Sequence, residues 1–187
     1  MIKKLLNPLV VSAFILIMLL GSLAHLIYGS CQSSKWHYII QHYYMTEYLP
    51  NYMLNKNDKV LTYPFSVYVN KDYSGVWRSW TVEGMLKIKA NYKNGANHGE
   101  FSAWYDNGKR HYKANLVNGE KHGKLIWWMR DDSSYCIQQW EFGVPISSFV
   151  YNKDGALNKK EYYNEKGNFQ RRELYKNNNL TKTETAE

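Results

Sequence analysis

Two histidines that recur at a regular spacing are the residues of this sequence best suited to bind a metal ion. His98 and His122 stand 24 positions apart, and each is followed by a glycine. If they occupy the same place in successive β-hairpins, two strand spacings separate their backbones by about 10 Å, which is too far for joint ligation. No cysteine or carboxylate recurs beside them with metal-ligand spacing, and His37 and His42 do not share a helix face. We therefore expect His98 and His122 to stabilise turns, and we predict no metal site.

The cysteines and the lack of catalytic motifs argue against enzymatic chemistry. Cys136 stands where Ile88 and Tyr112 stand in two preceding repeats, so we expect it to pack as a small apolar side chain. A disulfide between Cys136 and Cys31 is an alternative if the compartment is oxidising. The sequence has no glycine-rich phosphate loop, no Gly-x-Ser-x-Gly elbow and no carboxylate pair that can be separated from turn residues. We predict a protein that is not an enzyme, with no catalytic residues and no cofactor.

The histidines belong to a repeat with a period of 24 residues. The segments 75–80, 99–104 and 123–128 align, each beginning with glycine and ending with tryptophan, and Asn-Gly turns follow at matching places. Apolar and polar residues alternate between the turns, which is typical of β-hairpins with a turn that tolerates positive φ. A fixed period of this length indicates units that bury their apolar faces only by stacking on neighbours. The pattern predicts an all-β antiparallel hairpin array.

Alternation along the strands divides the aromatic residues between two faces. Trp77, Phe101 and Leu125 are expected on one side, and the tryptophans three positions later on the other. On the second strand of each hairpin, Lys87, Lys89, His111 and Lys113 alternate with the apolar side. The predicted partner-binding residues are Trp80, Trp104, Trp128, Arg78, Lys89 and Lys113, because aromatic and basic side chains dominate binding hot spots. Two alternatives stay open: a bulge that turns both rings inward, and an amino-terminal helix that covers the ladder.

Residues 94–109 (NGANHGEFSAWYDNGK) and 118–128 (NGEKHGKLIWW) resemble MORN-type repeats, in the variant of the bacterial YwqK family of antitoxin components. Three copies over roughly 73–143 match well, a fourth fits after a shift of one residue, and a fifth has lost its tryptophan. The resemblance covers somewhat more than half of the chain. It implies a MORN-like array and an antitoxin or immunity-type role, although fold alone does not assign an activity.

The amino terminus carries an export signal. Lys3 and Lys4 precede an apolar stretch from Pro8 to Tyr28, which is long enough to span a bilayer. A retained transmembrane anchor, a cleaved signal sequence and lipidation at Cys31 all stay open. Each of them places the repeats outside the cytoplasm, in the cell envelope of a bacterium or secreted from it.

The chain divides into four segments. Residues 1–30 form the signal or anchor, and 31–72 combine a short helix, which begins at Ser33-Ser34 and ends at Pro50, with lead-in strands over 59–69. The helix is expected to cap the first hairpin, or else to lie in the lipid headgroup region as a juxtamembrane helix. Residues 73–176 form the hairpin repeats, and 177–187 are expected to be disordered because they hold few apolar residues.

Charge and composition limit the possible partners. The formal net charge is +8 and aromatic residues make up 16% of the chain, which suits a thin sheet that attracts anionic partners. Export removes the chain from nucleic acid, which we exclude as a partner. We expect a non-catalytic protein-binding module that occludes an acidic toxin domain. The alternative is a membrane-associated scaffold or structural envelope protein that binds anionic lipid.

Overall fold

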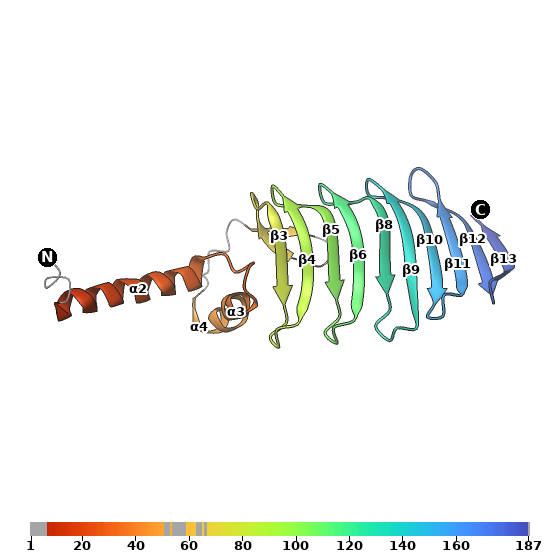
Figure 1. Ribbon diagram of the computed structural model, residues 1–187. Coiled ribbons are helices and arrows are strands. Elements are labelled where there is room, and N and C mark those ends of the chain that lie inside the picture. The colour runs from red at the N-terminus through yellow and green to blue at the C-terminus, as the bar shows by residue number, and fades with distance from the viewer. Residues whose placement is uncertain (1–6, 51–52, 54–58, 63–64, 66, 187) are drawn as a thin grey trace. The chain divides into compact units, whose positions relative to one another are not determined.

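The computed structural model describes residues 7–50, 53, 59–62, 65 and 67–186. The chain forms two compact units: a helical unit, and a β unit that holds almost all of the chain from Asp58 onwards. Lys3 and Lys4 lie outside the described residues. Figure 1 shows the helices of the first unit and the strands of the second.

The helical unit begins with the long apolar helix α2 (Pro8–Tyr28). The Asn7 side chain accepts a hydrogen bond from the backbone N–H of Leu9 at 2.9 Å, and proline occupies the first turn, where its missing N–H costs nothing. Among the described residues, α2 is the one helix long and apolar enough to cross a membrane. Helix α3 (Lys35–Ile39) follows, capped by Ser34 as predicted, and continues through a π-helical turn, η1 (Ile40–Tyr44), into α4 (Met45–Tyr48).

The Gln41 side chain ties η1 to the end of α2. Its Nε2 lies 3.0 Å from the carbonyl oxygen of Leu26 and 2.8 Å from that of Gly29. The last carbonyls of a helix have no partner within the helix. Gln41 therefore satisfies acceptors at the end of α2 that solvent would otherwise have to satisfy.

The β unit holds a two-stranded sheet and an 11-stranded antiparallel sheet. The small sheet pairs β1 (Lys59–Thr62) with β2 (Val67–Asn70). The large sheet follows chain order, with short β7 beside β6, and the prediction of a predominantly antiparallel β structure is confirmed. Its strands are β3 (Gly75–Trp80), β4 (Leu86–Lys93), β5 (Ala96–Trp104), β6 (Arg110–Val117), β7 (Glu120–Lys121), β8 (Gly123–Trp128), β9 (Ser134–Glu141), β10 (Val144–Asn152), β11 (Leu157–Tyr163), β12 (Phe169–Lys176) and β13 (Asn179–Thr185).

The turns between hairpins repeat the same geometry every 24 residues. The N–H of Gly95 donates to the carbonyl of Tyr73 at 2.9 Å, and the N–H of Gly119 donates to that of Asn97 at 2.8 Å. The residue before each glycine also has positive φ, 51° at Asn94 and 52° at Asn118. Asn and Gly are the residues that adopt this conformation at least cost, which explains why both recur.

The core lies on one face of the sheet, which we call the inner face. It consists of β4, β5, β6 and β8 side chains, including Phe101 and Leu125, packed with Val67 and Val69 of β2. The ring of Phe65 stacks on Phe101 with centroids 5.5 Å apart. The lead-in hairpin thus supplies a second layer that a single sheet lacks, and Phe101 is only 1% exposed.

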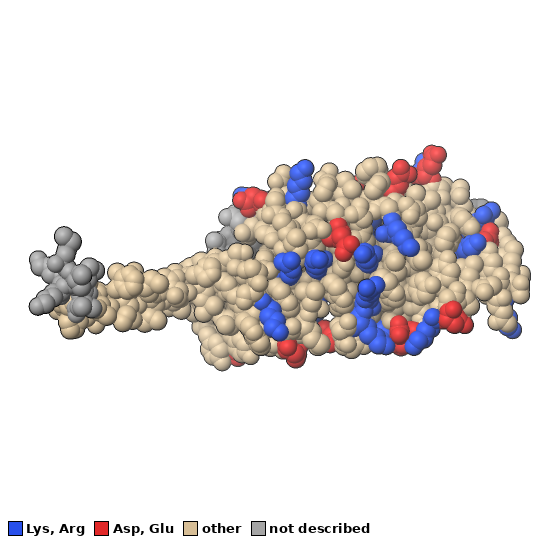
Figure 2. Space-filling model, in the orientation of Figure 1, with Lys and Arg blue, Asp and Glu red and all other residues tan. Residues whose placement is uncertain are grey.

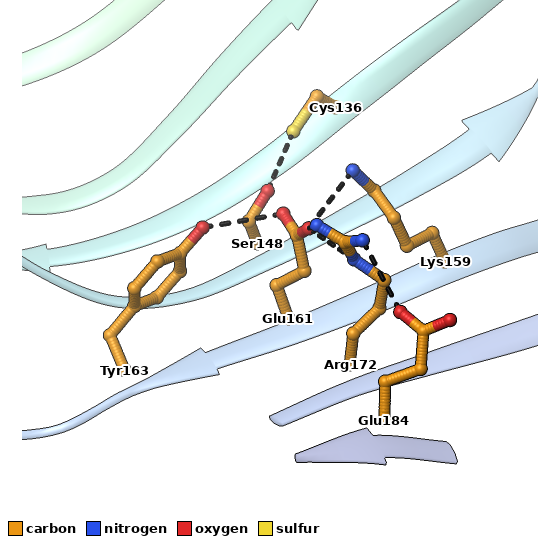
Figure 3. A network of polar contacts seen from close by, with 7 residues as sticks. All are labelled: Cys136, Ser148, Lys159, Glu161, Tyr163, Arg172 and Glu184. Carbon is orange, nitrogen blue, oxygen red and sulfur yellow. Dashed lines mark hydrogen bonds and ion pairs between the residues drawn. The ribbon is translucent and has the colours of Figure 1, made fainter. Parts of the chain in front are cut away.

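Beyond β8 the same face changes character. Strand register aligns Leu125 with a row of polar side chains on the next five strands, namely Gln138, Ser148, Glu161, Arg172 and Glu184. Figure 3 shows four members of this row, Ser148, Glu161, Arg172 and Glu184, in a network of polar contacts. Arg172 binds Glu161 at 2.7 Å and Glu184 at 3.4 Å, and Lys159 lies 3.2 Å from Glu161. Ion pairs replace apolar packing in this half of the array.

Glu161 stays ionised in this network although it is only 8% exposed. Burial alone would raise the pKa of its carboxyl group, but hydrogen bonds from Arg172 and Lys159 outweigh burial and hold the pKa below its usual value. A buried carboxylate needs such partners, because an unpaired charge is costly to desolvate.

The prediction that residues 177–187 are disordered is wrong for the described residues 177–186, which hold a turn and the strand β13. Asn177 and Asn178 adopt positive φ of 52° and 64° and turn the chain back, so that β13 pairs with β12. The composition is poor in apolar residues, but three threonines favour a strand, and the cross-strand ion pair of Glu184 with Arg172 ties it to β12.

Candidate functional site on the outer face

A row of basic side chains crosses the first four strands on the outer face, the face opposite the core. Register pairs Arg78 with Lys89, Lys89 with Ser102, and Ser102 with Lys113. Figure 2, seen from the side opposite β1 and β2, shows lysine and arginine atoms gathered over β3 to β8. Three of the predicted binding residues, Arg78, Lys89 and Lys113, therefore lie in one row on this face, with Ser102 between the two lysines.

A bulge in β6 decides which way the nearby rings point. Ala103 pairs with Tyr112 and Trp104 pairs with Arg110, so His111 is the extra residue of the bulge. Its ring packs 5.1 Å from Phe65, on the inner face. The prediction that His111 alternates with the core side is therefore wrong, because the bulged residue joins Tyr112 on the inner side. Trp104 keeps the outward direction that ideal alternation predicts.

Trp104 and Trp128 line a shallow hollow of about 300 Å³ on the outer face. The charged side chains around it are Lys89, Lys113, Arg110 and Glu100. The Arg110 guanidinium lies 5.9 Å from the centre of the Trp128 ring, within range of a cation–π contact. Four of the six predicted partner-binding residues, Trp104, Trp128, Lys89 and Lys113, thus meet in one place.

The charge of the hollow is set by three cations and one carboxylate. The Lys113 ammonium lies 3.0 Å from Glu100. Its hydrogen bond holds the pKa of Glu100 below the usual value, and Ser102 and Lys89 act in the same direction. Glu100 is therefore ionised at neutral pH, and the lining keeps a net charge of about +2. Such a surface suits an acidic group beside an aromatic or aliphatic one.

The other two predicted residues lie elsewhere. Trp80 is only 9% exposed, so it does not offer a free ring surface. Arg78 is half-buried at the β3 end of the basic row and does not line the hollow. The tryptophan ladder expected from the repeat is therefore reduced to its second and third members.

The histidines and cysteines occupy structural places. His98 Nδ1 lies 3.3 Å from the Asn118 side chain, and the His122 ring lies 4.4 Å from that of Phe142 between centroids, so each histidine contacts a turn residue further along the chain. Cys31 and Cys136 are not joined by a disulfide in the described structure, and Cys136 lies 3.2 Å from the Ser148 hydroxyl in a half-buried polar setting. The described part of the chain holds no group of three potential metal-ligating side chains.

Sequence reasoning missed Arg110 and Glu100 as members of the hollow. Arg110 reaches Trp128 only because the bulge at His111 shifts the register by one residue. Glu100 was visible as the polar neighbour of Ser102 on one face of a strand, since residues two apart point the same way. A search for acidic residues two positions from the basic row would have found it.

Comparisons with known proteins do not identify a family. No family model matches the chain, and no curated protein matches it. A solved structure described as the crystal structure of TarM aligns over 77% of this chain at 12% identity, with a TM-score of 0.25. The chain spans 27% of that structure, and a likeness at this level supports no conclusion about fold or function.

Proposed function

We propose that the protein is a non-catalytic, exported binding module whose outer face binds an acidic protein domain. The observation that carries the proposal is the meeting of Trp104 and Trp128 with Lys89, Lys113 and Arg110 around one hollow. Aromatic and arginine side chains are the usual anchors of protein interfaces. The resemblance of the repeats to MORN-type arrays of the YwqK family supports an antitoxin or immunity-type role, in which binding occludes a toxin.

An acidic partner fits this hollow better than an apolar one. The two tryptophans are half-buried and their rims are ringed by cations, so a ligand that covers them also approaches Lys89 and Lys113. Glu100 already pairs with Lys113 in the free protein. A carboxylate of the partner would add to that pair or replace it, and the surrounding positive potential would accelerate encounter.

Two neighbouring tryptophans provide a matched test. Trp128 lines the hollow, whereas Trp127 pairs with Tyr112 and Cys136, on the inner face, and is 49% exposed. The test uses the tagged full chain in detergent as bait for proteins in a bacterial envelope extract. We expect one stoichiometric acidic protein, retained by Trp127→Ala and weakened by Trp128→Ala by roughly 2 kcal/mol, or about 30-fold. Equal capture by both variants would contradict the proposal.

Charge reversal tests the same surface independently. Lys89→Glu should reduce capture, while Lys166→Glu, in an exposed turn between β11 and β12, changes the net charge equally and should not. A loss with both variants would mean that net charge alone attracts the partner, without a specific site.

A membrane-associated scaffold is the second candidate, favoured by the apolar helix α2 and by the basic row on the sheet. In that case the full chain, reconstituted in neutral vesicles, should bind a second population of anionic vesicles, and Lys89→Glu should weaken this. If lipid is the partner, the Trp128→Ala variant should capture the same proteins from the envelope extract as the wild type. The two assays therefore separate a protein partner from a lipid surface.

A further inference from the structure

Strand β13 pairs with β12 on one side, and its other edge is bounded by no strand of the described chain. The N–H of Ala186 donates to the carbonyl of Gln170 at 2.8 Å. Register pairs Thr185 with Arg171, Glu184 with Arg172 and Thr183 with Glu173. Because hydrogen-bonded and non-hydrogen-bonded pairs alternate in antiparallel sheets, Glu184 bonds to β12, whereas Thr183 and Thr185 direct their backbone groups away from it.

The charged side chains of β13 are complementary to those of a second β13 strand that runs antiparallel to it. Lys182 and Glu184 flank Thr183 and point to the inner face, where they form an ion pair of 2.7 Å. If two β13 strands pair antiparallel about a two-fold axis at Thr183, Lys182 of each chain stands opposite Glu184 of the other. Centring the pair on Lys182 or on Glu184 would instead oppose like charges.

We propose that β13 pairs with β13 of a second copy of this chain, antiparallel and centred on Thr183. In this register the outward backbone groups of Thr183 meet their own equivalents, so the donors and acceptors on this edge are used. The two sheets become one continuous sheet across the axis. A lone edge lysine discourages pairing of strands, but here the glutamate two positions later supplies its opposite charge.

The ion pairs of the inner face support the same register. Glu161, Arg172 and Glu184 alternate in sign across β11, β12 and β13 (Figure 3). Glu184, bound to Arg172 at 3.4 Å, is the last member of the row. In the proposed pair the next position is filled by Lys182 of the second copy, so the alternation of charge continues across the axis.

Charge reversal tests this interface without disturbing the sheet core. Lys182→Glu places two glutamates opposite each other on both sides of the axis, and Glu184→Lys does the same with lysines. We expect the full chain in detergent to be a dimer by light scattering, and each variant to dissociate about tenfold more readily, since two attractive cross-strand pairs become repulsive. An equimolar mixture of the two variants restores complementarity and should recover the dimer.

Two results would overturn the proposal. One is a wild-type chain that stays monomeric throughout the concentration range measured. The other is a wild-type dimer that Lys182→Glu leaves intact, which would assign the association to another surface, such as α2. Circular dichroism of each variant, compared with the wild type, checks that the β-sheet remains folded. Lys182 is exposed and should tolerate the change even if Glu184→Lys weakens the contact with Arg172.

Discussion

Alanine at two equivalent turn glycines should have unequal costs. Gly95 and Gly119 stand 24 residues apart, have φ of 74° and 88°, and donate the same inter-repeat hydrogen bond. Alanine at either position costs about 1 to 2 kcal/mol, because a Cβ disfavours the left-handed conformation. At Gly119 an added Cβ has no heavy atom within 4 Å, so alanine there adds no steric cost to this conformational one.

Gly95 carries an additional steric cost. A Cβ there would lie 2.8 Å from the carbonyl carbon and 2.9 Å from the Cα of Lys71, whereas ordinary contact begins at about 3.4 Å. Both are backbone atoms, so the lead-in hairpin itself has to move. Overpacking of this kind costs roughly 1 to 3 kcal/mol. We expect Gly95→Ala to lower the free energy of unfolding by about 2 to 5 kcal/mol.

Urea unfolding followed by tryptophan fluorescence measures both variants on the full chain in one detergent. The comparison uses the difference between the two variants, because both share the left-handed penalty and the same hydrogen bond. Losses that agree within about 0.5 kcal/mol would refute the close approach of Lys71 to this turn. A larger loss for Gly119→Ala than for Gly95→Ala would refute the repeat geometry as well.

Four further outcomes are expected. Phe142 holds positive φ of 42° where earlier repeats have asparagine, so Phe142→Asn should raise the free energy of unfolding by about 0.5 to 1 kcal/mol; a decrease would mean that its contact with His122 matters more. The buried Tyr112 hydroxyl has no hydrogen-bond partner in the described structure, so Tyr112→Phe should be neutral or stabilising by up to about 1 kcal/mol in the same assay. The lowered pKa of Glu161 predicts stability that is present above pH about 4.3 and lost as pH falls through the folded-state pKa, and Glu161→Gln should flatten this part of the pH profile of stability. If the repeats are exported, alkaline phosphatase fused to the carboxyl terminus should be active, and a fluorescent protein that folds only in the cytoplasm should be dark when fused at the same place. An inactive phosphatase with a bright fluorescent protein would contradict the predicted topology.

The first three hairpins were predictable because local chemistry repeats there with little change. Asn-Gly pairs mark the turns, and alternation from Phe101 to Ala103 identifies the buried side of a strand. The same alternation places Trp104 and Lys113 on the outer face, where the structure has them. Local rules sufficed because each of these residues interacts chiefly with the strands beside it.

Features that depend on distant residues were not predictable from the repeat. The bulged residue His111 packs against Phe65 of the lead-in hairpin, some 45 positions earlier in the chain. The burial of Trp80 breaks a ladder that sequence equivalence predicts to be uniform. The row through Ser148 and Glu161 lies where the repeat has degenerated, so the 24-residue period does not predict it.

The change from apolar to ionic side chains along the inner face has a physical cause in the covering layer. Leu125 is 2% exposed and belongs to the cluster that Val67 and Val69 help to close, whereas no buried residue of that cluster comes from β10 to β13 among the described strands. Without a second layer, a single sheet gains little from apolar residues, since one side of each would remain wet. Cross-strand ion pairs such as Glu161–Arg172 stabilise neighbouring strands without a covering layer. The array therefore tolerates a half without a conventional core. Its strand β13 carries charged side chains that can pair with opposite charges on a further strand.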